Sequence, residues 1–128
     1  MNYLLDTHVL LWLLNDETQI PDATLHALKQ PENALFFSIV SLWEIAIKKS
    51  LGKLSLTHSV QDVERELLRL SIVAIPIQGN HISYLETLPF HHRNPFDRML
   101  IAQAMTENLT LVSKDSVFPT YAAPVQWF

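Results

Sequence analysis

The sequence predicts an α/β fold in which helices flank a parallel sheet. Three observations lead to this prediction: short apolar runs recur along the chain, segments with helical periodicity separate them, and the two kinds of segment alternate throughout. Such alternation is typical of βαβ units, whose strands lie parallel and are covered by helices. With 128 residues, 48% of them hydrophobic, the chain has the size of one domain covering residues 1–128.

The predicted strands are short apolar segments, and they are residues 3–6, 34–38, 72–77, 109–113 and 125–128. The first has no polar alternation, as expected for a strand buried on both faces. The third is rich in β-branched residues, which favour strands. Right-handed crossovers place the carboxyl ends of such strands along one edge of the sheet, where α/β proteins form their sites.

The predicted helices lie between and beside these strands, at residues 8–15, 22–29, 41–51, 59–70, 81–87 and 95–108. Thr7 is the expected cap of the first helix, and Pro21 opens the second. Ser41 and Glu44 have the spacing of a capping box for the third helix, and Gly52 suits the position just after its end. The fourth helix is amphipathic, with its apolar residues on one face.

The composition excludes several classes of protein. There is no cysteine, which removes disulfides, thiolate catalysis and cysteine-ligated metal sites. The net charge of −4 argues against a broad basic surface for nucleic acid. The longest apolar run, residues 9–14, is too short to span a bilayer, and the N-terminus lacks the basic region of a signal peptide. We therefore expect a cytoplasmic protein without a membrane segment.

Four acidic residues that lie far apart in the sequence are the candidate site residues: Asp6, Glu44, Asp97 and Asp115. Each falls at the edge of an apolar segment, so parallel neighbouring strands would bring them to one end of the sheet. Carboxylates that converge there repel one another unless a cation binds between them. A hard divalent ion such as Mg²⁺ prefers these oxygen ligands. Without these four, nine of the thirteen acidic residues remain, which equals the number of Lys and Arg residues.

Each acid also has an ordinary structural explanation. Asp6 suits a helix cap, and Glu44 suits both the capping box and an ion pair with Lys48 four residues later. Asp97 lies in the first turn of a helix, where a negative charge favours the helix dipole. Asp115 suits a turn. The evidence for a shared site is therefore the common placement of the four acids, not any one of them.

The acids lie in four motifs that together span nearly the whole chain. The motifs are LLDTHVLLW at residues 4–12, SLWEIAIK at 41–48, HRNPFDRMLIAQA at 92–104 and LVSKD at 111–115. In this order they resemble the motifs of PIN-domain ribonucleases. The size and organisation of the chain are similar to those of VapC-type toxins of bacterial toxin–antitoxin pairs.

The resemblance implies a PIN-like three-layer sandwich with a five-stranded parallel sheet in the order 3-2-1-4-5. It also implies a Mg²⁺- or Mn²⁺-dependent endoribonuclease that forms a homodimer and has a cognate VapB-type antitoxin. Asp6, Glu44 and Asp97 are then expected to hold the metal, with Asp115 assisting. Relatives often carry an acid where this chain has Asn94, which caps a helix as well as Asp does but adds no charge.

Other residues near the acids have predicted supporting roles. Thr7, Ser113 and Asn94 are expected to hold the carboxylates and the local backbone in place, and Arg98 and Lys48 to contact RNA phosphates. We expect Lys114 to be an ordinary solvated charge. Trp12 and Trp43 are predicted to lie in the core or a dimer interface, not to serve as platforms for RNA bases.

A different class of function also fits the pattern. A PIN-like domain can be a catalytically silent module that binds RNA or protein. The presence of all four acids argues against this alternative, and a Mn²⁺ titration of cleavage would discriminate between the two.

Overall fold

A computed structural model describes residues 1–127 of the chain, and it contains a five-stranded sheet in the order β3-β2-β1-β4-β5. Every neighbouring pair of strands is parallel. The strands are β1 (Asn2–Leu5), β2 (Ala34–Ser38), β3 (Val73–Ile75), β4 (Thr110–Val112) and β5 (Val125–Gln126). The predicted fold class and strand order are therefore confirmed. Phe128, the last residue of the predicted fifth strand, lies outside the described residues.

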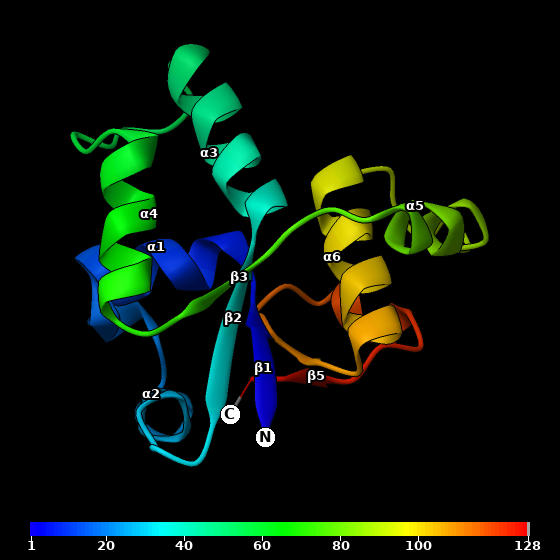
Figure 1. Ribbon diagram of the computed structural model, residues 1–128, viewed down its shortest axis with the longest axis horizontal. Coiled ribbons are helices and arrows are strands. Elements are labelled where there is room, and N and C mark those ends of the chain that lie inside the picture. Colours follow the sequence, from blue (N-terminus) through cyan, green and yellow to red (C-terminus); the bar gives the residue numbers. More distant parts are fainter. Residues whose placement is uncertain (128) are drawn as a thin grey trace.

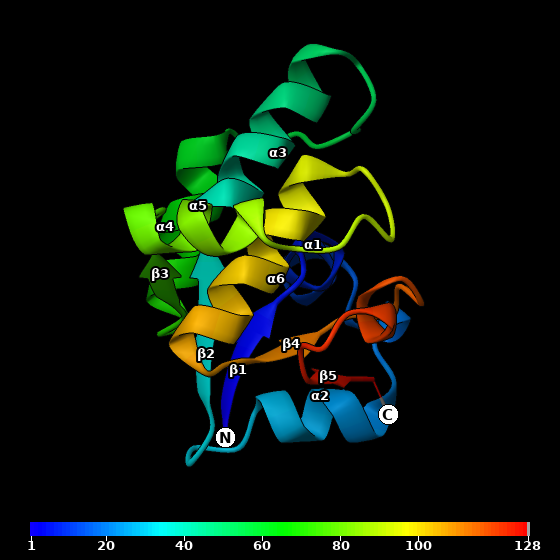
Figure 2. The same cartoon turned by 90° about the vertical axis from the view of Figure 1, so that its right-hand side faces the viewer.

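Helices cover both faces of this sheet (Figure 1). They are α1 (Thr7–Asn15), α2 (Asp22–Leu28), α3 (Ile39–Ser50), α4 (Val60–Arg69), α5 (Gly79–Glu86) and α6 (Pro95–Glu107), with short 3-10 turns η1 (Glu17–Gln19) and η2 (Phe118–Thr120). One face carries α1, α2 and α4, and the other carries α5 and α6, while α3 extends beyond the sheet edge (Figures 1 and 2). Within residues 1–127, no helix has the length and apolarity to cross a membrane.

The sheet separates two hydrophobic cores, and β1 contributes to both. Tyr3 and Leu5 belong to the core shared with α1, α3 and α4, whereas Leu4 belongs to the core shared with α6. Successive side chains of a strand point to opposite faces, which explains this division. Burial on both faces also explains why the strand has no polar alternation.

The start of α3 differs from the prediction. The helix begins at Ile39, and Ser38 is its cap, since the Ser38 hydroxyl accepts a hydrogen bond from the Val40 amide at 3.1 Å. The predicted capping box of Ser41 and Glu44 is therefore wrong. Because β2 runs directly into the helix without a loop, both residues lie inside the helix and are buried.

The start of α1 also differs, because Thr7 is the first helical residue and not the cap. Asp6 occupies the cap position but its side chain makes no capping hydrogen bond. Two local predictions are confirmed. The Asn94 side chain caps α6 by accepting from the Phe96 and Asp97 amides, and Gly52 follows α3 with a φ of +69°, which glycine adopts without strain.

Candidate active site

Three of the predicted acids lie at the carboxyl edge of the sheet. Asp6 directly follows β1, Glu44 lies on α3, which follows β2, and Asp97 lies in the first turn of α6. The N-terminal ends of α3 and α6 both lie at this end of the sheet, from which α3 extends away while α6 runs back beside the sheet (Figure 1). Asp6 and Glu44 are only 4% and 3% exposed, and the Asp97 side chain is 13% exposed. The fold therefore gathers three acids whose positions in the sequence are distant.

Asp97 carries the clearest electrostatic consequence of this arrangement. Burial, followed by the charges of Asp6 and Glu44, raises the pKa of Asp97 from 3.8 to about 6, although His92 opposes the shift. Both neighbouring carboxylates disfavour a further negative charge beside them. The three acids consequently share one electrostatic environment, as the placement of the motifs predicts.

Hydroxyl groups hold two of these carboxylates in place. The Ser113 hydroxyl donates to Asp6 Oδ2 at 2.9 Å, and the Thr7 hydroxyl donates to Glu44 Oε1 at 2.7 Å. The Thr7 oxygen also lies 2.9 Å from the Ser41 hydroxyl oxygen. These contacts are made by side chains from different βα units, so they fix the relative positions of the elements as well as the carboxylates.

Glu44 forms an ion pair with the ammonium group of Lys48. Lys48, one turn further along α3, places its Nζ atom 2.7 Å from Glu44 Oε2. The Lys48 side chain is 37% exposed, so its ammonium borders solvent while it neutralises part of the charge on Glu44. The geometry thus contains the ion pair that an i, i+4 spacing favours.

His92 is a site residue that the sequence analysis did not identify. Its Nε2 atom lies 3.3 Å from Asp97 Oδ2, and its Nδ1 atom lies 2.7 Å from the Tyr121 hydroxyl. The Tyr121 oxygen also accepts from Arg98 at 3.2 Å, so His92 connects Asp97 to the contacts of Arg98. Only the position of His92 just before the Asn94 cap hinted at this role.

The position of Arg98 does not suit the predicted contact with RNA. The residue is buried, and its guanidinium donates to the carbonyl oxygens of Pro89 and Leu88 at 2.8 and 3.3 Å. It also lies over the Phe90 ring, 4.1 Å from the centroid. Arg98 therefore ties the segment before α6 to the helix, because the residue is buried and its guanidinium makes hydrogen bonds within the protein.

Asp115 is less closely associated with the cluster than predicted. Its Oδ1 atom accepts from the Val117 amide at 3.0 Å, which is the turn role that the sequence also allowed. The main charges that shift the pKa of Asp97 are those of Asp6, Glu44 and His92. Asp115 does border a hollow that Asp6 also lines, so the two acids face the same space.

The donor chemistry of the cluster suits a hard divalent ion. The candidate ligands Asp6, Glu44 and Asp97 supply only oxygen atoms, and their mutual repulsion would be relieved by a cation. Among residues 1–127, however, no three Asp, Glu or His side chains are arranged as a ready-made metal-binding group. Each carboxylate instead contacts a protein partner. Mg²⁺ retains several waters and needs few direct carboxylate ligands, so the donor set fits this ion without a closed cage.

Solved structures of several toxin–antitoxin proteins share the fold of this chain. VapBC2 from Rickettsia felis, bound to a DNA fragment from its promoter, matches with a TM-score of 0.75 and 19% identity over 100% of both chains. VapBC-1 from nontypeable Haemophilus influenzae matches with a TM-score of 0.67 and 18% identity over 98% of this chain and 97% of that chain. VapBC-5 from Mycobacterium tuberculosis gives 0.60 and 18%, over 98% and 95%.

Identities this low establish a shared fold and not a shared activity. No curated protein sequence matches the chain significantly. The family model of the PIN domain, however, matches residues 3–124, which include all four motifs. The chain therefore belongs to the PIN domain family.

Proposed function

We propose that this protein is a Mg²⁺-dependent endoribonuclease and the toxin of a VapBC-type toxin–antitoxin pair. The observation that carries the proposal is the position of Asp97, where burial and then the charges of Asp6 and Glu44 raise its pKa to about 6. Perturbed carboxyl groups of this kind concentrate at functional sites. PIN domains are generally nucleases, and the cluster lies where an α/β sheet forms its site.

Asp6, Glu44 and Asp97 are the residues that would hold the divalent ion, either directly or through water, and Asp115 would assist. The ion would supply activation of the attacking water and neutralisation of charge on the phosphoryl oxygens. Mn²⁺ has the same preference for oxygen ligands and is expected to substitute.

The remaining residues orient the carboxylates. Ser113 fixes Asp6, Thr7 fixes Glu44, and His92 holds one oxygen of Asp97. Asn94 caps α6 and so fixes the backbone of its first turn, in which Asp97 lies. Lys48, whose ammonium borders both Glu44 and solvent, remains a proposed contact for an RNA phosphate.

The proposed partners follow from the solved relatives. The matched structures are VapBC assemblies, in which a toxin is bound by its antitoxin. We therefore propose a VapB-type antitoxin for this protein. The homodimer and the cytoplasmic location that we also propose rest on its membership of the PIN domain family and on its sequence. Growth arrest on expression of this chain, relieved by co-expression of a neighbouring small reading frame, would support this assignment. Arrest that persists in the Asp97→Asn variant would contradict it.

The decisive experiment maps cleavage sites on total cellular RNA with the purified protein. We expect defined cuts with Mg²⁺, none with excess chelator, and none with Asp97→Asn. Asp22→Asn is the matched control, because it makes the same chemical change at an exposed position on α2, far from the carboxyl edge of the sheet (Figure 2). Cutting that survives chelation would exclude the metal from the mechanism.

One observation favours the alternative of a silent binding module. Each of the three carboxylates contacts a protein group, and residues 1–127 contain no preformed three-residue metal group. A Mn²⁺ titration separates the two functions. An enzyme gains activity that saturates with Mn²⁺, whereas a silent module binds RNA with equal affinity at every Mn²⁺ concentration and cuts none.

A further inference from the structure

A hollow beside the acid cluster has no role in the function proposed so far. Its volume is about 420 Å³, which lies in the range of pockets that bind small ligands. The lining residues come from the start of α1 and from the loop after β4, and they are Asp6, His8, Trp12, Lys114, Asp115 and Ser116. Because Asp6 belongs to both, the hollow is continuous with the acid cluster.

Aromatic rings form one wall of the hollow. The Trp12 ring lies 6.0 Å from the His8 ring at an interplanar angle of 38°, as the i, i+4 spacing on α1 allows. Trp127, the residue after β5, packs on Trp12, with ring centroids 6.0 Å apart and an interplanar angle of 49°. The indole of Trp12 is therefore held in position before any ligand arrives. A fixed aromatic ring of this kind is a surface on which a nucleobase stacks.

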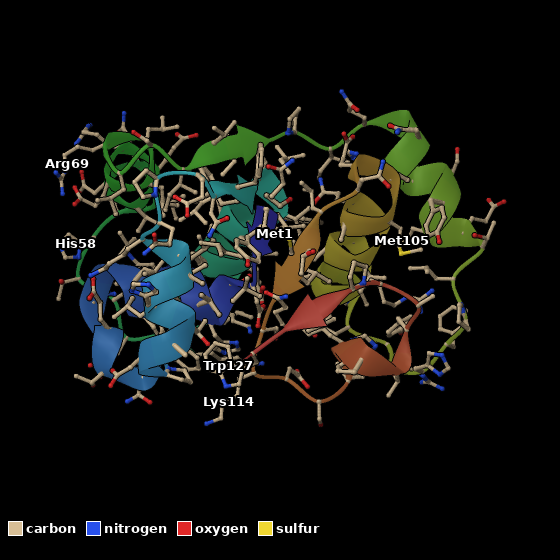
Figure 3. All side chains as sticks on the ribbon, turned by 90° about the horizontal axis from the view of Figure 1, so that it is seen from below. Met1, His58, Arg69, Met105, Lys114 and Trp127 are labelled. Carbon is tan, nitrogen blue, oxygen red and sulfur yellow. The ribbon has the colours of Figure 1, made fainter. Side chains whose placement is uncertain are left out.

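A free cation forms another part of the wall. Lys114 is exposed and, among residues 1–127, it takes part in no salt bridge. Figure 3 shows its side chain extending from the periphery of the molecule, with Trp127 further inward in the same view. An unpaired ammonium beside aromatic rings suits a nucleotide phosphate, and it disfavours a basic peptide in the same space.

We propose that this hollow binds the nucleotide adjacent to the scissile phosphate of a single-stranded RNA. Its base stacks on Trp12 and His8, and its phosphate lies near Lys114. This inference rests on the proposed function, since Asp6 places the hollow next to the reacting bond. It also differs from two expectations from the sequence, which placed Trp12 in the core or a dimer interface and Lys114 in solvent.

The two acids in the wall add a condition. Asp6 and Asp115 repel a phosphate, so the hollow accepts the nucleotide only when a divalent ion neutralises the cluster. Binding of RNA in the hollow is consequently expected to require Mg²⁺. This dependence separates specific binding there from general attraction to surface lysines, which added salt of any kind weakens.

The first test measures cleavage of short oligoribonucleotides that carry one abasic residue at each position around the cut. For the unaltered protein, loss of the base at one flanking position is expected to raise KM by roughly tenfold, as for loss of a stacked base. His8→Ala and Trp12→Leu are expected to remove this sensitivity, whereas Trp12→Phe keeps it. His8→Ala is informative even if Trp12→Leu fails to fold, because the His8 side chain is 63% exposed.

Lys114→Ala is expected to raise KM several-fold and leave kcat nearly unchanged. Lys53→Ala is its control, because it removes the same charge from an exposed residue that does not line the hollow. Lys53 lies in the connection between α3 and α4. Equal KM values for these two variants, together with no sensitivity to abasic residues, would overturn the hollow as the nucleotide site.

The second test locates the base directly. The unaltered protein is mixed with Mg²⁺ and oligoribonucleotides carrying 5-iodouridine and irradiated at once, and the crosslinked peptides are identified by mass spectrometry. We expect crosslinks to Trp12 or His8. Crosslinks at the exposed Trp43, which packs edge-on against Phe96 and does not line the hollow, or no crosslinks, would overturn the proposal.

The two proposals fail in different ways. If the unaltered protein cuts no RNA with Mg²⁺ or Mn²⁺, the nuclease function is wrong and the nucleotide site falls with it. If the protein cuts RNA and Asp97→Asn does not, but the abasic and crosslinking results point elsewhere, only the hollow is wrong.

Discussion

The ionisable groups at the two ends of α6 have opposite kinds of neighbour. At the C-terminal end, fully buried His81 accepts a hydrogen bond from the Gln78 amide at Nδ1, and its Nε2 lies 2.8 Å from Glu107. Nδ1 is therefore unprotonated, so the Nε2 proton goes to the Glu107 carboxylate. At the N-terminal end, Asp97 faces two further carboxylates. One end pairs donors with acceptors, and the other gathers like charges.

This contrast shows that unfavourable electrostatic interactions are found at the N-terminal end of α6 and not at its C-terminal end. The same helix supplies both ends, so a general weakness in packing does not explain the crowding of Asp97. Arg98, the next residue, has its donors satisfied by carbonyl oxygens and the Tyr121 hydroxyl. The repulsion is thus confined to the carboxylates, which is the pattern expected of a site that a cation completes.

The largest expected effect is the loss of catalysis when the crowded end is altered. Asp97→Asn is expected to lower the rate of Mg²⁺-dependent RNA cleavage by roughly 100-fold or more, as loss of a group acting on transition-state charge does. Single-turnover kinetics beside Asp22→Asn would measure this. Activity within a few-fold of the parent would remove Asp97 from the mechanism.

The second effect concerns stability and pH. Because the pKa of Asp97 is about 6 in the folded protein and near 3.8 when unfolded, the folded state holds its proton more tightly. The stabilisation is complete below the unfolded pKa and is lost as the pH rises through 6. Without divalent ions, Asp97→Asn is therefore expected to be more stable than the parent at pH 8, by at most about 2–3 kcal/mol.

Urea denaturation at pH 8 and pH 4 would check this sign. The advantage of the variant is expected to shrink towards pH 4, where the parent carboxyl is protonated. A variant that is less stable than the parent at pH 8 would show that the hydrogen bond of Asp97 with His92 outweighs the repulsion.

The third effect tests the paired end of α6. His81→Leu leaves the Gln78 amide and the Glu107 carboxylate without their partner, at an expected cost of about 1–3 kcal/mol in the free energy of unfolding. Cleavage per folded molecule is expected to be unchanged, because His81, on α5, contacts the C-terminal end of α6, whereas Asp97 lies at its N-terminal end. Denaturation and kinetics on the same sample would separate the two readouts. A selective loss of catalysis would remove the distinction between the ends.

The smallest effect is stabilisation by the metal. Saturating Mg²⁺ is expected to stabilise the parent by about 1–2 kcal/mol through mass action, and to stabilise Asp97→Asn less. Thermal unfolding with NaCl at matched ionic strength is the control for screening. Equal shifts in both proteins would place the ion elsewhere.

The sequence identified more of the fold than of the site. The alternation of strands and helices depends on residues that are close in the chain, and so does the cap at Asn94. Both can therefore be predicted from the sequence. The start of α3 could not be predicted from the sequence, because Ser38 and Ser41 are both suitable caps. The absence of a loop after β2 selected Ser38.

By itself, the sequence determined that acids stand at the edges of βα units, since hydrophobic periodicity sets the elements and the acids fall at their ends. Only the tertiary structure decided which neighbours they have. Asp97 and Arg98 are adjacent in the chain, but successive helical residues point in different directions, so one joins the acid cluster and the other is buried against Tyr121. The contacts of His92 with Tyr121 and of Asp6 with Ser113 likewise join residues far apart in sequence, because packing of the whole sheet brings them together.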